Sequence, residues 1–172
     1  MSNENIKLIK NYLNNFTIET TPGVYKKYEE FSSLINKNHS IYITYLPDEK
    51  SKNVIETAKK LKLEGYDVIP HLPSRTILDK LELEKYIGSL SEESGFDKIL
   101  IIGGGGNQKG NISSTMDVLK TDLLSKYKFI EVGVAGHPEG SPDISNEELD
   151  KAIIEKNNFS FNADFKMYLA TQ

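Results

Sequence analysis

The segment from Gly133 to Ser145, GVAGHPEGSPDIS, joins a strand-like run to a dense group of polar residues. Its first residues are small or apolar, as in a buried strand, and the chain then turns into His137, Glu139 and Ser141. Imidazole and carboxylate groups hold and move protons, so this group is a candidate for acid–base chemistry or ligand binding. Taken singly, each of these residues is equally compatible with an ordinary packed or solvated role.

Other polar residues also occur where a strand is expected to end. Glu19 lies in a β-rich run at 16–21, where a carboxylate is out of character. A buried carboxyl there could stay partly protonated and act as a general acid, whereas an outward-facing strand charge is the alternative. His71 is either a ligand-binding or a packed histidine. Arg75 and Lys156 are candidate anion contacts or simply solvated charges.

The run IIGGGGNQKG, with glycines at 103–106, resembles a nucleotide-binding loop at first sight. Neither GxGxxG nor GxxxxGK[ST] fits it in any register, so a dinucleotide fingerprint is not predicted. Glycines after a strand favour a close approach of the backbone to a ligand, and the alternative is a loop that needs positive φ at several positions.

Composition excludes several classes of function. The 172 residues include no cysteine, which rules out disulfides, thiolate zinc sites and cysteine nucleophiles. The three histidines lack a ligand spacing such as HxxxH, so no metal site is predicted. A net charge of −4 without a basic cluster argues against nucleic acid as a partner. The N-terminus lacks the apolar core of a signal peptide and no segment is long enough to span a membrane, so we expect a cytoplasmic protein.

Strand-like and helix-like segments alternate along the chain, and 38% hydrophobic residues suffice for one domain over 1–172 with a substantial core. We expect strands at 16–21, 39–47, 66–73, 97–106, 128–136 and 163–172. Apolar spacing and start and stop signals predict helices at 24–36, 48–65, 74–95, 111–127 and 145–157. Ser74 is the expected N-cap of the third helix, and Gly95 its stop.

Strands that are apolar on both faces predict a parallel sheet covered by helices, within the α/β class. A doubly wound sheet and a (β/α)8 barrel both fit this pattern. Nearly every strand ends in polar residues, which favours a TIM-type barrel, where all strands direct their C-terminal ends at one cavity. Only the first six βα units of such a barrel are present.

Taken together, the segments resemble the methylenetetrahydrofolate reductase family. The resemblance extends over most of the chain and is most specific in its PHL and HPEGSPD stretches. The matching segments are IETTP (18–22), ITYLP (43–47), GYDVIPHLPSRTI (65–77), KILIIGG (98–104), SSTMDVLKT (113–121), VGVAGHPEGSPDIS (132–145) and ADFKMYLATQ (163–172).

The resemblance implies a flavin-dependent (β/α)8 barrel in one-carbon and methionine metabolism. In this family, NAD(P)H reduces bound FAD, and hydride then passes to 5,10-methylenetetrahydrofolate to give 5-methyltetrahydrofolate. Glu19 matches the acid that protonates the folate nitrogen as its five-membered ring opens, and Gln172 matches a glutamine that binds the pterin. Six residues match positions at or near the flavin: Thr44, His71, Ser114, Thr115, His137 and Lys156. Lys156 requires an insertion in the match.

Three departures from the family pattern leave alternatives open. Gly105 stands where the family usually carries an Asp that touches flavin and folate, and Ser141 replaces a common histidine. The family also continues through two further βα units, so these 172 residues alone could be inactive. The alternatives are a non-catalytic relative that binds folate or flavin without turnover, and a truncated product. NADH or NADPH as the donor, and a homo-oligomeric state, are both left open.

Overall fold

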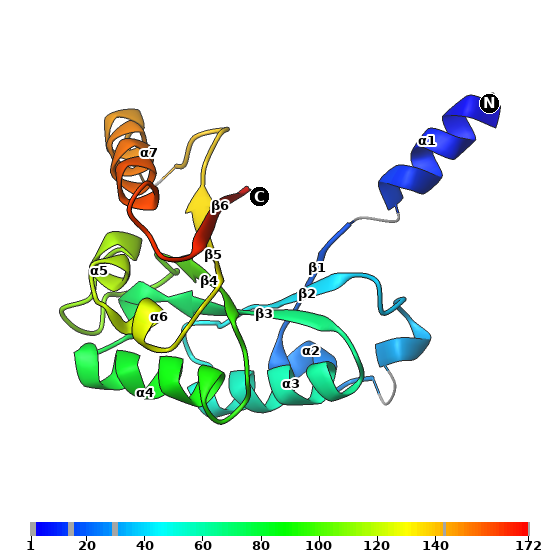
Figure 1. Ribbon diagram of the computed structural model, residues 1–172, viewed down its shortest axis with the longest axis horizontal. Coiled ribbons are helices and arrows are strands. Elements are labelled where there is room, and N and C mark those ends of the chain that lie inside the picture. The colour runs from blue at the N-terminus through cyan, green and yellow to red at the C-terminus, as the bar shows by residue number, and fades with distance from the viewer. Residues whose placement is uncertain (1–2, 14–15, 29–30, 143, 172) are drawn as a thin grey trace. The chain divides into compact units, whose positions relative to one another are not determined.

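The computed structural model describes residues 3–13, 16–28, 31–142 and 144–171. The chain divides into two compact units, residues 1–70 and 71–172. Strands and helices alternate in both (Figure 1). The first unit contains α1 (Asn3–Leu13), β1 (Ile18–Thr20), α2 (Pro22–Tyr25), the 3₁₀ helix η1 (Phe31–Ser33), β2 (Ser40–Ile43), α3 (Ser51–Leu63) and the start of β3 (Asp67–Pro73). The second contains η2 (Ser74–Thr76), α4 (Lys80–Ser91), β4 (Lys98–Ile102), α5 (Thr115–Leu119), α6 (Leu123–Lys126), β5 (Glu131–Gly136), α7 (Asn146–Ser160) and β6 (Lys166–Thr171).

The sheet pairs its strands in the order in which they occur in the chain, β1-β2-β3-β4-β5-β6, and every pair is parallel. The start of β3 pairs with β2, and its end, from His71, pairs with β4. The predicted α/β class with a parallel sheet is therefore confirmed. The order has no reversal, whereas doubly wound sheets reverse their strand order at a switch point.

An aromatic cluster in the first unit explains why the predicted helix at 24–36 is wrong. The described part of that segment holds only the short α2 and η1. Tyr25 and Phe31 pack with their ring centroids 5.8 Å apart, and Phe31 also packs on Tyr66. Residues six apart in a continuous helix point to different sides, so this contact requires a break. The Tyr25 hydroxyl donates to Glu64, and burial followed by this contact raises the pKa of Tyr25 to about 12.

The core of the second unit lies around the central strands. The residues of β3 from His71 onward are all buried, as are Ile99 to Ile101 in β4. The apolar face of α4 adds Leu83, Ile87 and Leu90, each fully buried. Burying side chains of this size contributes roughly 1.5–3 kcal/mol each before entropy is counted.

Two helix boundaries in the second unit differ from the prediction. Asp79, not Ser74, caps α4, because its carboxylate accepts the N–H of Glu82. Ser74 instead lies buried in η2, where its hydroxyl donates to the carbonyl of Ile102. The segment 111–127 forms two short helices, α5 and α6, and the Thr121 hydroxyl between them donates back to Val118.

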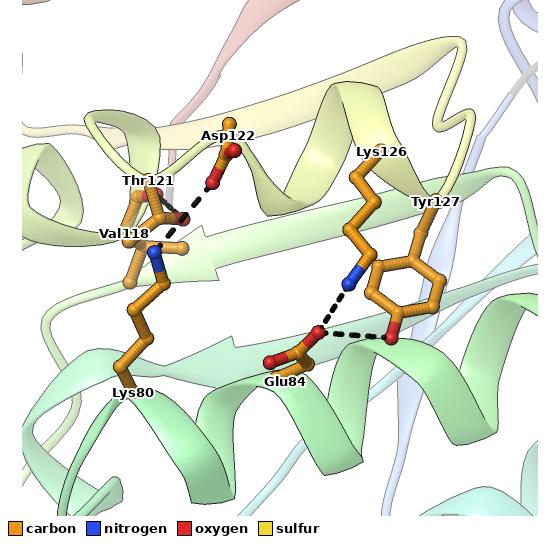
Figure 2. Close-up of polar contacts among 7 residues, drawn as sticks. All are labelled: Lys80, Glu84, Val118, Thr121, Asp122, Lys126 and Tyr127. Carbon is orange, nitrogen blue, oxygen red and sulfur yellow. Dashed lines mark hydrogen bonds and ion pairs between the residues drawn. The ribbon is translucent and has the colours of Figure 1, made fainter.

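The break between α5 and α6 allows α6 to lie against α4. Figure 2 shows Glu84 of α4 facing Lys126 at the end of α6 and Tyr127 directly after it, which both donate to its carboxylate. A second ion pair joins Lys80 to Asp122 at 3.6 Å. Because these groups are largely exposed, we infer that they orient α6 more than they stabilise the fold.

In the described part of the chain, none of the helices combines the length and the apolar character needed to cross a membrane.

Gly133 in β5 provides a test of this packing. A Cβ built on Gly133 lies 2.7 Å from the ring of Tyr168 and 2.8 Å from Leu100, whereas a Cβ on Gly136 in the same strand meets nothing closer than 3.5 Å. We expect Gly133→Ala to lower the free energy of unfolding by about 1–3 kcal/mol, since overpacking forces neighbours to shift. Gly136→Ala is the matched control. Equal urea midpoints for the two variants would contradict the packing of β5 against β6.

Candidate functional site

Polar side chains of the first unit meet at the ends of β1 and β2. Glu19 of β1 is exposed, and its Oε2 accepts a hydrogen bond from Thr44 Oγ1 at 3.2 Å. Thr44 directly follows β2, and its backbone N–H donates to the carbonyl of Thr20 at 2.8 Å, which extends the strand ladder. The hydroxyl of Thr44 therefore holds an exposed carboxylate in place, where a ligand can reach it.

His71 lies in β3, at the boundary of the second unit, and is only 1% exposed. Its backbone carbonyl accepts a hydrogen bond from the Tyr86 hydroxyl at 2.8 Å, which ties β3 to α4. The imidazole is thus part of the packed interior, and contact with a ligand would require its neighbours to move.

Two predicted residues from distant parts of the sequence share one pocket in the second unit. His137 directly follows β5, and Lys156 projects from α7, which lies beside β6 (Figure 1). The pocket has a volume of about 240 Å³, and both residues line it. Its other lining residues are mostly apolar and come from the end of β5, from α7 and from β6: Ala135, Gly136, Pro138, Leu149, Asp150, Ala152, Ile153, Leu169 and Thr171.

The amine of Lys156 is held against the sheet. Its Nζ donates to the carbonyl of Ala135 at 2.8 Å, and burial lowers the pKa of the amine below its usual value. Desolvation disfavours the ammonium ion, and a nearby negative charge would favour it. The pocket therefore contains one partly desolvated amine, from Lys156, and one carboxylate, from Asp150, and suits a polar group of a ligand.

Ser114 and Thr115 begin α5 and have structural partners. The Ser114 hydroxyl accepts the N–H of Asp117, and the carboxylate of Asp117 accepts the backbone N–H groups of Ser113 and Ser114. This is a capping box, which satisfies the free N–H groups at the start of a helix. Thr115 is 6% exposed, so its side chain packs inside.

Close packing within the protein accounts for part of the glycine-rich loop after β4. Gly104 adopts a φ of +85°, and a Cβ there would lie 2.7 Å from Pro73. A Cβ on Gly110 would lie 1.7 Å from the carbonyl oxygen of Leu78. The loop therefore packs closely on Pro73 at the end of β3 and on the backbone of Leu78 after it, and of the two alternatives this favours the conformational one for Gly104.

The two departures from the family pattern fall on accessible positions. Gly105 is exposed, and a Cβ there meets nothing within 4 Å. Ser141 forms an isolated antiparallel bridge with Ile144 in the turn after His137. Gln172, the predicted pterin contact, lies outside the described residues.

No family model matches the chain. The proposals below therefore rest on the site itself and on the quoted motifs. Among the residues that the structure describes, no group of three or more His, Asp or Glu side chains could hold a metal ion.

Sequence reasoning missed one polar residue of the pocket, Asp150, whereas Thr171 belongs to the polar end expected for the strand at 163–172. The available signal was the spacing of Leu149, Ile153 and Lys156, which recur at four and three residues and so share one helix face. Asp117 was also missed, although Ser114 and Asp117 have the spacing of a capping box.

The capping box gives a pH-dependent prediction for Asp117. Burial raises the pKa of this carboxyl, but hydrogen bonds from Ser113 and Ser114 outweigh it, and the net shift is downward. A lowered folded-state pKa contributes stability above the unfolded value of about 3.9, which is lost as the pH falls through the folded value. We therefore expect Asp117→Asn to destabilise the protein at pH 7 and to approach wild type as the pH falls through the lowered folded-state pKa of Asp117. Urea titrations across this range measure the difference. A constant difference between the two proteins at all pH values would contradict the role of the ionised cap.

Proposed function

We propose that the chain carries the flavin-facing part of a reductase that converts 5,10-methylenetetrahydrofolate to 5-methyltetrahydrofolate with NAD(P)H. The observation that carries this proposal is the shared pocket of His137 and Lys156. The resemblance assigns both residues to flavin, and they lie nineteen positions apart in the sequence. A pocket that joins them at the end of a parallel strand is what a barrel-mouth cofactor site needs.

The strand order supports a barrel as the architecture of this proposal. Strands paired in sequence order, with a helix or helical turn after each of β1 to β5, are the repeating arrangement of a (β/α)8 barrel. The proposal takes residues 1–172 as six units of one such barrel domain, in a cytoplasmic enzyme.

The pocket fits only part of FAD. Its volume of about 240 Å³ is below the range of roughly 300–1,000 Å³ for sites that enclose a drug-sized ligand. Lys156 supplies a cation and His137 an imidazole, which together suit a phosphate or hydroxyl-rich segment. His71 and Thr115 are buried and are not among the residues that line this pocket. When bound, FAD would accept hydride from NAD(P)H and pass it to the folate.

Glu19 is the proposed general acid. Its carboxyl would donate a proton to the folate nitrogen as the carbon–nitrogen bond of the five-membered ring breaks, leaving the substrate iminium that accepts hydride. Thr44 would act as a positioning residue, because its hydroxyl donates to Glu19 Oε2. Gln172 would bind the pterin.

A second candidate function follows from Gly105. Without a carboxylate at this position, the chain could bind flavin or folate and not turn them over. The open surface around Gly105 leaves room for an Asp side chain. If this candidate holds, Gly105→Asp should change the flavin chemistry, and an unchanged flavin would weigh against it.

The first test is the visible absorption spectrum of the purified chain after incubation with FAD and desalting. We expect a retained flavin spectrum that bleaches when NADH is added without oxygen, because Lys156 and His137 would hold the cofactor. Lys156→Met should lower FAD retention, whereas Lys120→Met, at an exposed position on the same unit, should not. A colourless wild-type protein would count against the proposal.

The second test addresses Glu19. In Glu19→Gln, reduction of bound flavin by NADH should persist, while folate turnover falls by about 10²-fold or more, since only the second half-reaction needs the proton. Glu56→Gln, which alters an exposed carboxylate on α3, is the control. Undiminished folate turnover in Glu19→Gln would exclude the general-acid role. It would not contradict the proposal that the chain binds flavin.

A further inference from the structure

Arg75 is the only arginine in the chain, beside 20 lysines. It lies in η2, directly after the C-terminal end of β3, and its side chain is exposed. Arginine differs from lysine in carrying a planar group of N–H donors that matches two oxygens of a carboxylate or phosphate at once. A single arginine at the end of a core strand is thus a specific feature of this sequence.

The backbone around Arg75 is fixed on both sides. Its N–H donates to the carbonyl of Gly103 at 3.0 Å, and its carbonyl accepts the N–H of Lys109 at 2.9 Å. The residues next to it are buried, and Thr76 Oγ1 donates to the carbonyl of Pro73 at 2.8 Å. A rigid backbone lowers the entropy cost of holding a guanidinium against a ligand.

The two segments that meet here carry positive charge and no carboxylate. Residues 71–78 and 103–111 contain Arg75 and Lys109 and neither Asp nor Glu. The next carboxylates along the chain, Asp79 and Glu82, accept the backbone N–H groups of Glu82 and Leu78 at the start of α4. These two segments therefore contribute only positive side-chain charge, although the whole chain has a net charge of −4.

The neighbouring loop leaves space for a ligand. A Cβ atom added to Gly103 or Gly105 would have no atom of a non-neighbouring residue within 4 Å. By contrast, Gly104 and Gly110 are in close contact with the segment after β3. The loop is thus anchored at two glycines and open at the other two, next to the backbone of Arg75.

We propose that Arg75, with Lys109 and the open glycines, forms a binding site for an anion with paired oxygens. The identity of the ligand that carries this anion rests on the proposed function. The anion is either a carboxylate of the folate glutamyl tail or a phosphate of the nicotinamide nucleotide. Both present two oxygens to one guanidinium. This site is separate from the pocket of Lys156 in the residues that line it.

The single arginine makes the test direct, because a ¹⁵N-labelled full chain gives one arginine Nε–Hε signal. We would titrate it with tri-γ-glutamate and, separately, with pyrophosphate, with NaCl at equal ionic strength as the reference. A saturable shift with tri-γ-glutamate identifies the carboxylate source, one with pyrophosphate identifies the phosphate source, and either supports the site. A drift with both probes that only follows the NaCl reference would overturn it.

Calorimetry with the same two probes provides a second measurement and uses two variants. Arg75→Lys keeps the charge and loses the paired donors, so binding should weaken by about tenfold. Lys120→Ala, which removes an exposed charge on the same unit, should bind as wild type does. Equal affinities of wild type and Arg75→Lys would overturn the proposal. Since neither probe contains flavin or pterin, a failure to retain FAD would reject the reductase and leave this site standing.

Discussion

Parallel hydrogen bonding between strands taken in sequence order is the constraint on which the rest of the structure depends. Each strand from β2 to β5 is bonded to a neighbour on both sides, so its backbone N–H and C=O groups are not left at a free edge. The C-terminal ends of neighbouring strands consequently lie at one edge. In the second unit, the loops that follow β3, β4 and β5 carry Arg75, the glycine run and His137. Backbone pairing alone therefore brings these residues to the same edge of the sheet.

The sequence was sufficient for the strands and for the longest helices. A continuous apolar run such as Ile99 to Ile102 has few alternatives to a buried strand, and α7 begins at the capping box of Ser145 and Glu148. Prediction from the sequence failed where tertiary contacts determine the local structure. Helical spacing at 24–36 was outweighed by the aromatic cluster of Tyr25 and Phe31, and the cap expected at Ser74 is formed by Asp79. The helix α1 was not anticipated at all.

The site was predicted in its parts but not in its arrangement. His137 could be placed at a strand end from the sequence, and its meeting with Lys156 could not, because the length of α7 and its angle to β6 are set by packing. The glycine run illustrates a different limit. Sequence indicates that the backbone approaches something closely, yet only coordinates reveal that Gly104 and Gly110 approach Pro73 and Leu78.

The sparse packing of α7 has a consequence for ligand affinity. None of its residues, Asn146 to Ser160, is fully buried, and Ile154 within the helix and Phe161 at its C-terminal cap are largely exposed. Local opening free energies follow the number of buried contacts, so this helix should separate from the sheet far more often than β4 or β5 does. A ligand bound beside Lys156 must then also keep α7 packed against the sheet. Ordering α7 offsets part of the favourable free energy of the ligand's contacts. The residence time of the ligand is then determined by the opening of α7 rather than by the core.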